Sequence, residues 1–340
     1  MRAVLFICFL LTTIAPAVAA KITIALVPSI PGGATYVAAD EGYFHDAGLD
    51  VDIERIDSLG KAVAFLATDQ VQVAQGGINA GFYNSVAQGL PVVLALESGS
   101  SPTYHQILVR ADLKDKIRKP ADLKGRTIGL SSPGSTSMYE VASVLASAGL
   151  TLQDVEAKNL AFSQMAAALA NGALDAALEV APFTERIVEE KIAVPWIDPD
   201  DYITPQPMTS VGYIVNTDWA RQNRDIARKL FVSLARAGRD YCQAYHHGPN
   251  RAEIIDIFLK NRIGTDRGLL DRMAWQARSP NGEFNVASIL DMQAFFARVG
   301  LINKTSPAEK LVDPSYAVDV GKELAPFAPI NKASPLKGCR

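Results

Sequence analysis

The strongest constraint on the fold is a regular alternation of short apolar runs with segments of helical period, starting at Lys21. Residues 22–27, 51–56, 71–74 and 92–96 are predicted strands, and residues 36–44, 61–67 and a segment ending at Val86 are predicted helices. A second series places strands at 107–109, 127–130, 155–159, 176–180 and 211–215, and helices at 135–147, 163–171 and 182–190. Such alternation favours mostly parallel sheets flanked by helices. We therefore expect an α/β chain with two halves and a helical C-terminal tail after Asp218.

Residues 1–20 have the pattern of an export signal. Arg2 precedes an apolar run over residues 3–14, and small residues of the A-x-A type follow. This order is typical of a cleaved secretory signal. We expect cleavage after Ala19 or Ala20, and the apolar run is too short to span a bilayer comfortably.

Charge and cysteine content exclude several functions. The full sequence has a net charge of −3 and no basic field, so no nucleic-acid partner is expected. No Cys/His spacing resembles a metal site, and no metal or cofactor is expected. Cys242 and Cys339 could pair in an oxidising compartment. Alternatively, Cys242 is a buried thiol and Cys339 belongs to a mobile tail over residues 331–340. The adjacent His246 and His247 are interpreted as a solvated helix end.

Polar or glycine-containing turns follow several predicted strands. They are residues 28–33, 75–79, 97–101 and 131–137, together with Glu179 just before Pro182. Ligands of open α/β sheets bind beyond the carboxyl ends of the strands. Turns from both halves therefore predict two walls of one cleft.

The turn over residues 131–137 carries the clearest signal. Serine and threonine hydroxyls gather where a strand ends and a helix begins, beside N–H groups that lack helical partners. These groups could bind an anion or another acceptor. The alternative is an ordinary helix cap made by Ser135 or Thr136.

Several motifs together resemble the periplasmic substrate-binding proteins of ABC importers, in the branch that handles nitrate, sulfonates, taurine and thiamine-pyrimidine precursors. They are Tyr36-Val-Ala-Ala-Asp-Glu-Gly-Tyr-Phe44 with Gly48-Leu-Asp-Val51, Asp122-Leu-Lys-Gly-Arg-Thr-Ile-Gly129, Pro133-Gly-Ser135, Gly149-Leu150 with Asp154-Val155, and Ala168-Leu-Ala-Asn-Gly-Ala-Leu-Asp-Ala176. The resemblance covers nearly all of the chain after residue 20.

This resemblance implies a type II periplasmic binding protein fold. Its first lobe would comprise residues 21–103 and 216–330, and its second lobe residues 104–215. The crossovers between the lobes would lie near residues 104–109 and 211–216. Ligand would bind between the lobes, and the cleft would close like a hinge.

The resemblance also implies ligand contacts from both lobes. The candidate ligand-binding residues are Ser29, Gly33, Tyr36, Gly77, Asn79, Ser98, Ser100, Ser132, Gly134, Ser135, Thr136 and Glu179.

Some of these candidates have structural alternatives. Asn79 could cap its own helix, and Tyr36 could be a core aromatic. Glu179 would favour a ligand with N–H donors or positive charge if it faces the cleft, but it could instead form a surface salt bridge. His105 could be a hinge residue or an accepting group. No Lys or Arg lies in the five turns, which weakens a nitrate or sulfonate assignment unless a tail residue such as Arg278 contributes.

The expected function is that of a periplasmic solute-binding protein, a monomer without enzymatic activity. It would capture a small polar organic molecule (sulfonate, carboxylate or pyrimidine-like) and deliver it to the membrane subunits of an ABC permease. One alternative is an enzyme of the thiamine-pyrimidine synthase type, but that resemblance implies a Cys-rich motif that this sequence lacks. Another is a ligand sensor for a membrane receptor.

Overall fold

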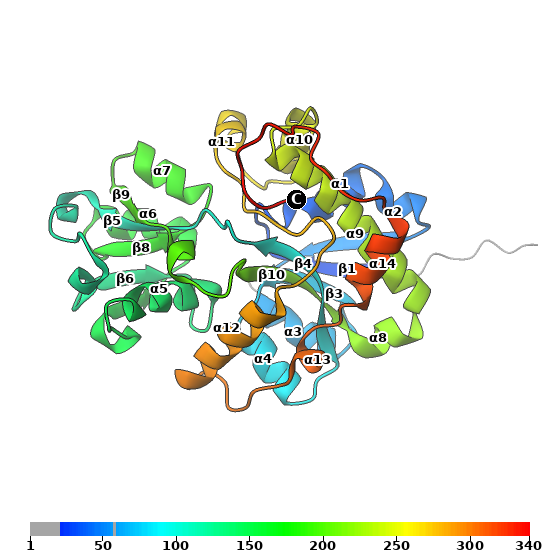
Figure 1. Cartoon of the computed structure of the whole chain (residues 1–340), viewed down its shortest axis with the longest axis horizontal. Coiled ribbons are helices and arrows are strands. Elements are labelled where there is room, and N and C mark those ends of the chain that lie inside the picture. The colour runs from blue at the N-terminus through cyan, green and yellow to red at the C-terminus, as the bar shows by residue number, and fades with distance from the viewer. Residues whose placement is uncertain (1–20, 57–58) are drawn as a thin grey trace, which may run out of the picture.

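The computed structural model describes residues 21–56 and 59–340 and shows two lobes joined by two crossing segments (Figure 1). The predicted export signal, residues 1–20, lies outside this described part. Within residues 21–56 and 59–340, no helix is both long and apolar enough to span a membrane.

Each lobe is built on one five-stranded sheet. The first sheet has the order β2-β1-β3-β10-β4, and the second β7-β6-β8-β5-β9. We call the parts built on these sheets the first and second lobes. The strands are β1 (Lys21–Leu26), β2 (Asp50–Arg55), β3 (Val73–Gly77), β4 (Val92–Ser100), β5 (Gln106–Arg110), β6 (Thr127–Leu130), β7 (Glu156–Asn159), β8 (Ala176–Glu179), β9 (Ala193–Ile197) and β10 (Thr209–Asn216).

One strand of each sheet runs opposite to the others. It is β10 in the first lobe and β5 in the second, and both pair antiparallel with their neighbours. Each is the strand by which the chain enters that lobe from the other. A strand that enters at the carboxyl edge of a parallel set must run away from that edge. The predicted α/β fold with mostly parallel sheets is therefore confirmed, with the crossovers explaining the exceptions.

The second crossover differs from its predicted position. Residues 211–216 lie within β10, which is a central strand of the first sheet. The chain returns to the first lobe before Thr209, after β9 and a short 3₁₀ turn, η4 (Pro199–Tyr202). Strand β9 itself was not predicted, because Pro195 and Trp196 interrupt its apolar alternation.

Helices cover both sheets, and the segment after β10 is mostly helical as predicted. Gly42, at φ 75°, splits the predicted helix over 36–44 into α1 and α2. The helices are α1 (Gly33–Asp40), α2 (Tyr43–Asp46), α3 (Leu59–Ala67), α4 (Ala80–Ala87), α5 (Thr136–Ala146), α6 (Phe162–Ala170), α7 (Phe183–Glu189), α8 (Thr217–Gln222), α9 (Arg224–Tyr245), α10 (Arg251–Lys260), α11 (Arg267–Arg272), α12 (Val286–Arg298), α13 (Ala308–Leu311) and α14 (Ser315–Glu323), with 3₁₀ turns η1 (Ala111–Leu113), η2 (Pro120–Leu123) and η3 (Leu152–Asp154).

Two hydrophobic cores sandwich the first sheet. Tyr213 of β10 packs with the residues of α9 on one face, whereas its neighbour Ile214 packs with Phe82 and Phe296 on the other. This separation follows from the alternation of side chains along a strand. Each large apolar side chain buried here stabilises the fold by about 1.5–3 kcal/mol relative to exposure. The helical tail is thus an integral part of the first lobe.

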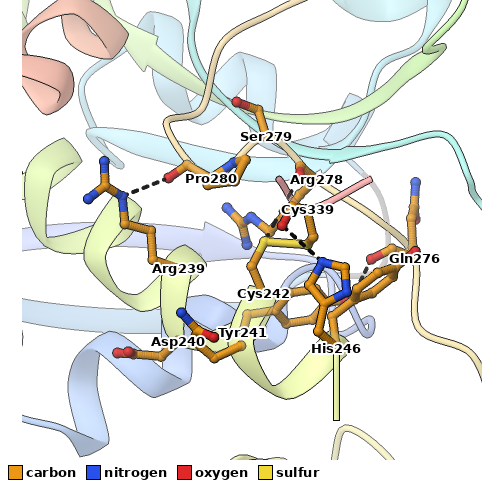
Figure 2. The surroundings of a disulfide bond; sticks show 12 residues. Arg239, Asp240, Tyr241, Cys242, His246, Gln276, Arg278, Ser279, Pro280 and Cys339 are labelled. Carbon is orange, nitrogen blue, oxygen red and sulfur yellow. Dashed lines mark hydrogen bonds between the residues drawn. A yellow bond between two sulfur atoms is a disulfide. The ribbon is translucent and has the colours of Figure 1, made fainter. Parts of the chain in front are cut away.

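The C-terminal residues do not form the predicted mobile tail. Cys339 is 2% exposed and forms a disulfide with Cys242 of α9 (Figure 2). His246 is fully buried and bonds the Ser334 hydroxyl and the Cys339 carbonyl, so its prediction as a solvated helix end is also wrong. The sequence left the cysteine pairing open, and nothing in the spacing of 97 residues could have decided it.

Candidate functional site

The carboxyl edges of the two sheets face each other. Gln106, the first residue of β5, lies opposite Glu179, the last residue of β8. Thr209, the first residue of β10, lies opposite Ser100, the last residue of β4. The chain crosses between lobes just before Gln106 and Thr209, so both strand edges border the space between the lobes. This edge is where open α/β sheets bind ligands.

Two predicted wall turns meet across this space. The Ala80 N–H donates to the Gly134 carbonyl at 2.9 Å, and the Thr136 hydroxyl donates to the Ile78 carbonyl at 3.0 Å. Gly134 has φ 68°, and a Cβ built there would lie 2.8 Å from the Ala80 Cβ. Gly134 therefore permits both the left-handed turn and the close approach of the lobes.

Further contacts between the lobes lie on either side of these turns. The Tyr139 hydroxyl of α5 donates to Asp291 of α12 at 2.7 Å. Arg272 of α11 forms an ion pair with Glu189 of α7, and both side chains are more than half exposed. The lobes are thus in a closed arrangement.

Within the turn over residues 131–137, Ser135 performs the capping role. Its hydroxyl donates to the Ser132 carbonyl at 2.6 Å and accepts from the Met138 N–H at 3.4 Å. It also shares a hydrogen bond with the Ser137 hydroxyl at 2.8 Å. Ser132 is exposed. The structure thus brings Gly134 and Thr136 to the opposite lobe, whereas Ser135 organises the turn.

In the first lobe, Gly77 and Asn79 lie on the turn that faces Gly134. A Cβ at Gly77 would lie 3.6 Å from the Thr136 hydroxyl. The Asn79 side chain accepts from the Phe82 N–H at 3.0 Å and caps α4, as its structural alternative predicted. Both residues border the space between the lobes, and their contact with a ligand stays a prediction.

Ser98 and Ser100 are buried at the end of β4. Ser98 is fully buried and accepts from the Gln75 amide at 3.2 Å. Ser100 is 7% exposed, and its N–H donates to the Ala277 carbonyl at 2.8 Å. Their predicted contact with a ligand has no direct support.

Three candidates after β1 have packing or turn roles. A Cβ at Gly33 would lie 2.4 Å from the Phe258 ring, so this glycine allows α1 to pack on α10. Tyr36 is 7% exposed within the first-lobe core, where its hydroxyl is 3.5 Å from Arg55, so it is not a stacking surface. The Ser29 hydroxyl bonds within its own turn, to the Val27 carbonyl and the Gly32 N–H. Tyr36 thus has the core position that its structural alternative predicted, and contact of Ser29 or Gly33 with a ligand stays a prediction.

Glu179 is the most unusual group at this edge. It is fully buried, and neither carboxyl oxygen has a hydrogen-bond partner among residues 21–56 and 59–340. Burial raises the pKa of this carboxyl to about 8. The surface salt bridge offered as an alternative is wrong, because Glu179 is fully buried. An orphaned buried carboxyl costs free energy that a polar partner would recover.

A second cluster of buried polar groups lies beside the turn over residues 28–33. Arg278 is 2% exposed, and its Nη1 approaches the Pro31 carbonyl at 3.5 Å. Its Nε has no hydrogen-bond partner in the part of the chain that the structure describes. Glu97 is fully buried, and burial raises its pKa to about 8 although Arg278 opposes that shift. One side-chain oxygen each of Glu97 and Gln75 lacks a hydrogen-bond partner within the described ranges. Sequence reasoning missed Glu97 and Gln75, although both lie in turns it singled out.

The two crossovers are tied together by Asp200. Its carboxylate accepts from the Ser101 hydroxyl, the Thr103 N–H and the Thr103 hydroxyl at 2.7–3.0 Å. Next to them, His105 Nδ1 lies 2.8 Å from the fully buried Glu140. Burial lowers the pKa of His105, but Glu140 outweighs that effect and the net pKa is raised. His105 thus lies next to the first crossover and pairs with Glu140, and its role as a hinge residue or an accepting group stays a prediction.

Comparisons with known proteins give the family and the fold. The profile of the family described as NMT1/THI5 like matches residues 33–247. No curated protein matches the sequence. Among solved structures, the alkanesulfonate-binding protein SsuA of Xanthomonas axonopodis pv. citri, bound to MOPS, has 17% identity and a TM-score of 0.69, covering 86% of this chain and 98% of that chain. The periplasmic nitrate-binding protein NrtA of Synechocystis PCC 6803 has 13% identity and a TM-score of 0.72, covering 90% and 89%.

A third structure, from Bordetella bronchiseptica RB50, has 21% identity and a TM-score of 0.71, covering 89% of this chain and 98% of that chain. At these identities the likeness shows the fold alone. It confirms the predicted two-lobe periplasmic binding protein fold, with its helical C-terminal part.

Proposed function

The chain belongs to the NMT1/THI5-like family, and from that premise we propose that it is a periplasmic solute-binding protein. It captures a small polar organic molecule between its lobes and delivers it to the membrane subunits of an ABC importer. The family, the two-lobe fold and the predicted export signal support this proposal. A monomer suffices, because both walls of the proposed site come from one chain.

The proposal rests on one observation. The turn over residues 131–137 contacts the turn over residues 75–79 of the other lobe, at the edge where the buried carboxyl of Glu179 lies. The turn with Gly134 and Thr136 contacts the turn with Ile78 and Ala80, so a molecule at this edge touches both lobes only when they are closed. Such a molecule would stabilise the closed state through its differential affinity. Glu179 lies at the same edge, and its carboxyl has no hydrogen-bond partner among the residues that the structure describes.

Glu179 also favours one ligand class among those proposed. With a pKa of about 8, its carboxyl is mostly protonated at neutral pH and presents one donor and one acceptor. The edge of an aminopyrimidine offers a matching acceptor and donor. A sulfonate or a carboxylate offers acceptors only, and would leave the second oxygen of Glu179 unpartnered. We therefore propose a pyrimidine-like solute over a simple anion.

A ligand panel tests the solute-binding role. The protein is unfolded, freed of bound molecules, refolded and heated with alkanesulfonates, small carboxylates, nitrate or aminopyrimidines in separate arms. A ligand at 100 times its Kd adds about 2.7 kcal/mol to the stability of the native state. We expect a shift with aminopyrimidines. A shift with sulfonates alone would contradict the ligand class, and no shift in any arm would contradict the solute-binding proposal.

Variants of the second-lobe turn separate binding from capping. Ser135→Ala combined with Thr136→Val removes the three hydrogen bonds of the Ser135 hydroxyl within its turn and the bond from Thr136 to the Ile78 carbonyl. We expect ligand affinity to fall by more than about 1 kcal/mol, with a smaller loss of stability. Ser143→Ala is the matched control, because its hydroxyl bonds only the preceding turn of the same helix. Equal losses of affinity and stability would favour a purely capping role.

The alternative functions make different predictions. An enzyme of the synthase type would convert its bound ligand. A change in the mass of the ligand during incubation with the protein would therefore contradict the solute-binding proposal and favour the enzyme. Its expected Cys-rich motif is absent from the sequence, and Cys242 and Cys339 are bonded to each other. A sensor for a membrane receptor would close by the same mechanism, and pull-down against the two classes of membrane protein would distinguish them.

A further inference from the structure

The C-terminal segment over residues 325–340, here called the C-terminal strap, runs back along α9 (Figure 1). Arg239 donates to the Ala325 carbonyl at 2.6 Å, and Gln243 donates to the Ala328 carbonyl at 3.0 Å. Asn331 donates to the His246 carbonyl at 2.8 Å. The strap is thus attached to the first lobe at intervals along one helix.

A buried anchor fixes the last residues of the strap. Cys339 forms a disulfide with Cys242, and His246 lies beside it (Figure 2). The two ring nitrogens of His246 lie 2.9 Å from the Ser334 hydroxyl and 3.1 Å from the Cys339 carbonyl. Cys242 and Cys339 are 0% and 2% exposed, which shields the disulfide from reductants in the folded protein.

The anchored strap reaches the first crossover through two hydroxyl groups. The Tyr245 hydroxyl donates to the Lys337 carbonyl, so its only proton is used there. The Tyr104 hydroxyl, 3.0 Å away, must therefore donate to Tyr245. Tyr104 lies on the first crossover, between cis-Pro102 and His105. A continuous chain of hydrogen bonds links this crossover to the strap.

Backbone packing provides a second link. Gly338 has φ 80°, and a Cβ there would lie 2.5 Å from the Ala277 Cβ and 3.1 Å from the Pro102 Cδ. The Ala277 N–H in turn donates to the Pro102 carbonyl at 2.9 Å. The strap therefore packs over the hydrogen bond between Ala277 and Pro102 of the crossover. Only glycine fits at position 338, because a side chain there would clash with Ala277.

Tyr104 is the strained residue that these contacts support. Its φ of 55° is in the left-handed region, which costs about 1–2 kcal/mol for a residue with a side chain. Such a conformation persists where surrounding contacts hold it. Hinge motions are absorbed by φ and ψ changes at a few connecting residues, and Tyr104 lies on one of the two connections between the lobes.

We propose that the C-terminal strap is a hinge brace. By holding Tyr104 in its left-handed conformation, the strap favours the closed arrangement of the lobes. The buried disulfide makes this a permanent brace rather than a redox switch. The inference rests on the proposed closure of the lobes, but it requires no particular ligand.

The distance between the lobes tests this proposal. Exposed Lys116 in the second lobe and exposed Val318 in the first are each replaced by a genetically encoded ketone-bearing amino acid, and spin labels are attached to the ketones by chemistry that spares cysteine. Pulsed electron spin resonance then gives the distance distribution of the ligand-free protein. Tyr245→Phe keeps the ring but breaks the link between Tyr104 and Lys337. The variant loses the bonds of Tyr245 to Lys337 and to Tyr104, and only the bond to Tyr104 involves the crossover. We expect the closed-to-open ratio to fall about fivefold, the size of that one hydrogen bond.

A second variant and a control make the result decisive. Cys242→Ser with Cys339→Ser frees the strap and should shift the distribution in the same direction as Tyr245→Phe. Tyr316→Phe, a tyrosine that packs on Phe231 of the same helix α9, should leave it unchanged. Distributions equal to wild type in Tyr245→Phe would overturn the brace while leaving closure intact. A single fixed distance in the wild-type protein would overturn both the brace and the proposed closure.

Discussion

Replacing the buried carboxyl of Glu179 with the amide in Glu179→Gln tests the electrostatics of the proposed site. Burial raises the pKa of Glu179 from 4.5 to about 8 in the folded state. Below pH 4.5 the carboxyl is neutral in both states and imposes no ionisation cost. As pH rises towards 8, the unfolded chain loses its proton first, so the wild-type protein loses stability.

The expected size follows from that pKa difference. The ionisation cost of wild-type Glu179 is about 1 kcal/mol at pH 5 and about 4 kcal/mol at pH 8, at 1.36 kcal/mol per pKa unit. Glutamine cannot ionise, so the stability of Glu179→Gln relative to wild type should rise by about 3 kcal/mol over this range. A partnerless amide adds a cost of its own, but that cost does not depend on pH.

Denaturant unfolding at pH 5, 7 and 8 measures this difference in the ligand-free protein. Glu97 is also buried with a pKa of about 8, but it is present in both proteins and cancels in the comparison. The exposed Glu283→Gln serves as the control. A stability difference for Glu179→Gln that stays constant between pH 5 and 8 would refute the reasoning.

Three further perturbations have defined outcomes. Gly134→Val should weaken ligand binding at least tenfold in a thermal-shift titration, because its side chain would clash with the first-lobe turn; unchanged affinity would contradict closure at this point. Asp200→Asn should lower the free energy of unfolding by about 1–3 kcal/mol, since it weakens three bonds between the crossovers. His105→Gln should lower the free energy of unfolding most below pH 6.5, and this loss should shrink as pH rises through the raised pKa of His105. Unfolding measured across this pH range checks the expectation.

The alternation of strands and helices was sufficient to predict the α/β class. The direction of the crossover strands β5 and β10 was harder to predict, because whether a strand pairs parallel or antiparallel depends on where the chain enters the sheet. Residues 211–215 were correctly predicted as a strand, yet their apolar run carries no sign that β10 lies between β3 and β4.

Local sequence also could not separate functional polar groups from structural ones. Ser135 and Asn79 have the residue types of both a cap and a ligand contact, and the structure shows their caps. The orphaned oxygens of Glu179 became visible only once its burial was known. The anchoring of the strap depends on contacts between Cys242 and Cys339 across 97 residues, which no local pattern encodes.

The most direct test of solute capture is native mass spectrometry of the protein purified under native conditions without refolding. We predict one non-covalent small molecule per wild-type chain, and its loss from Gly134→Val, in which the wall turns cannot meet. A wild-type chain that carries no such molecule, or a Gly134→Val chain that retains it, would contradict binding between the closed lobes.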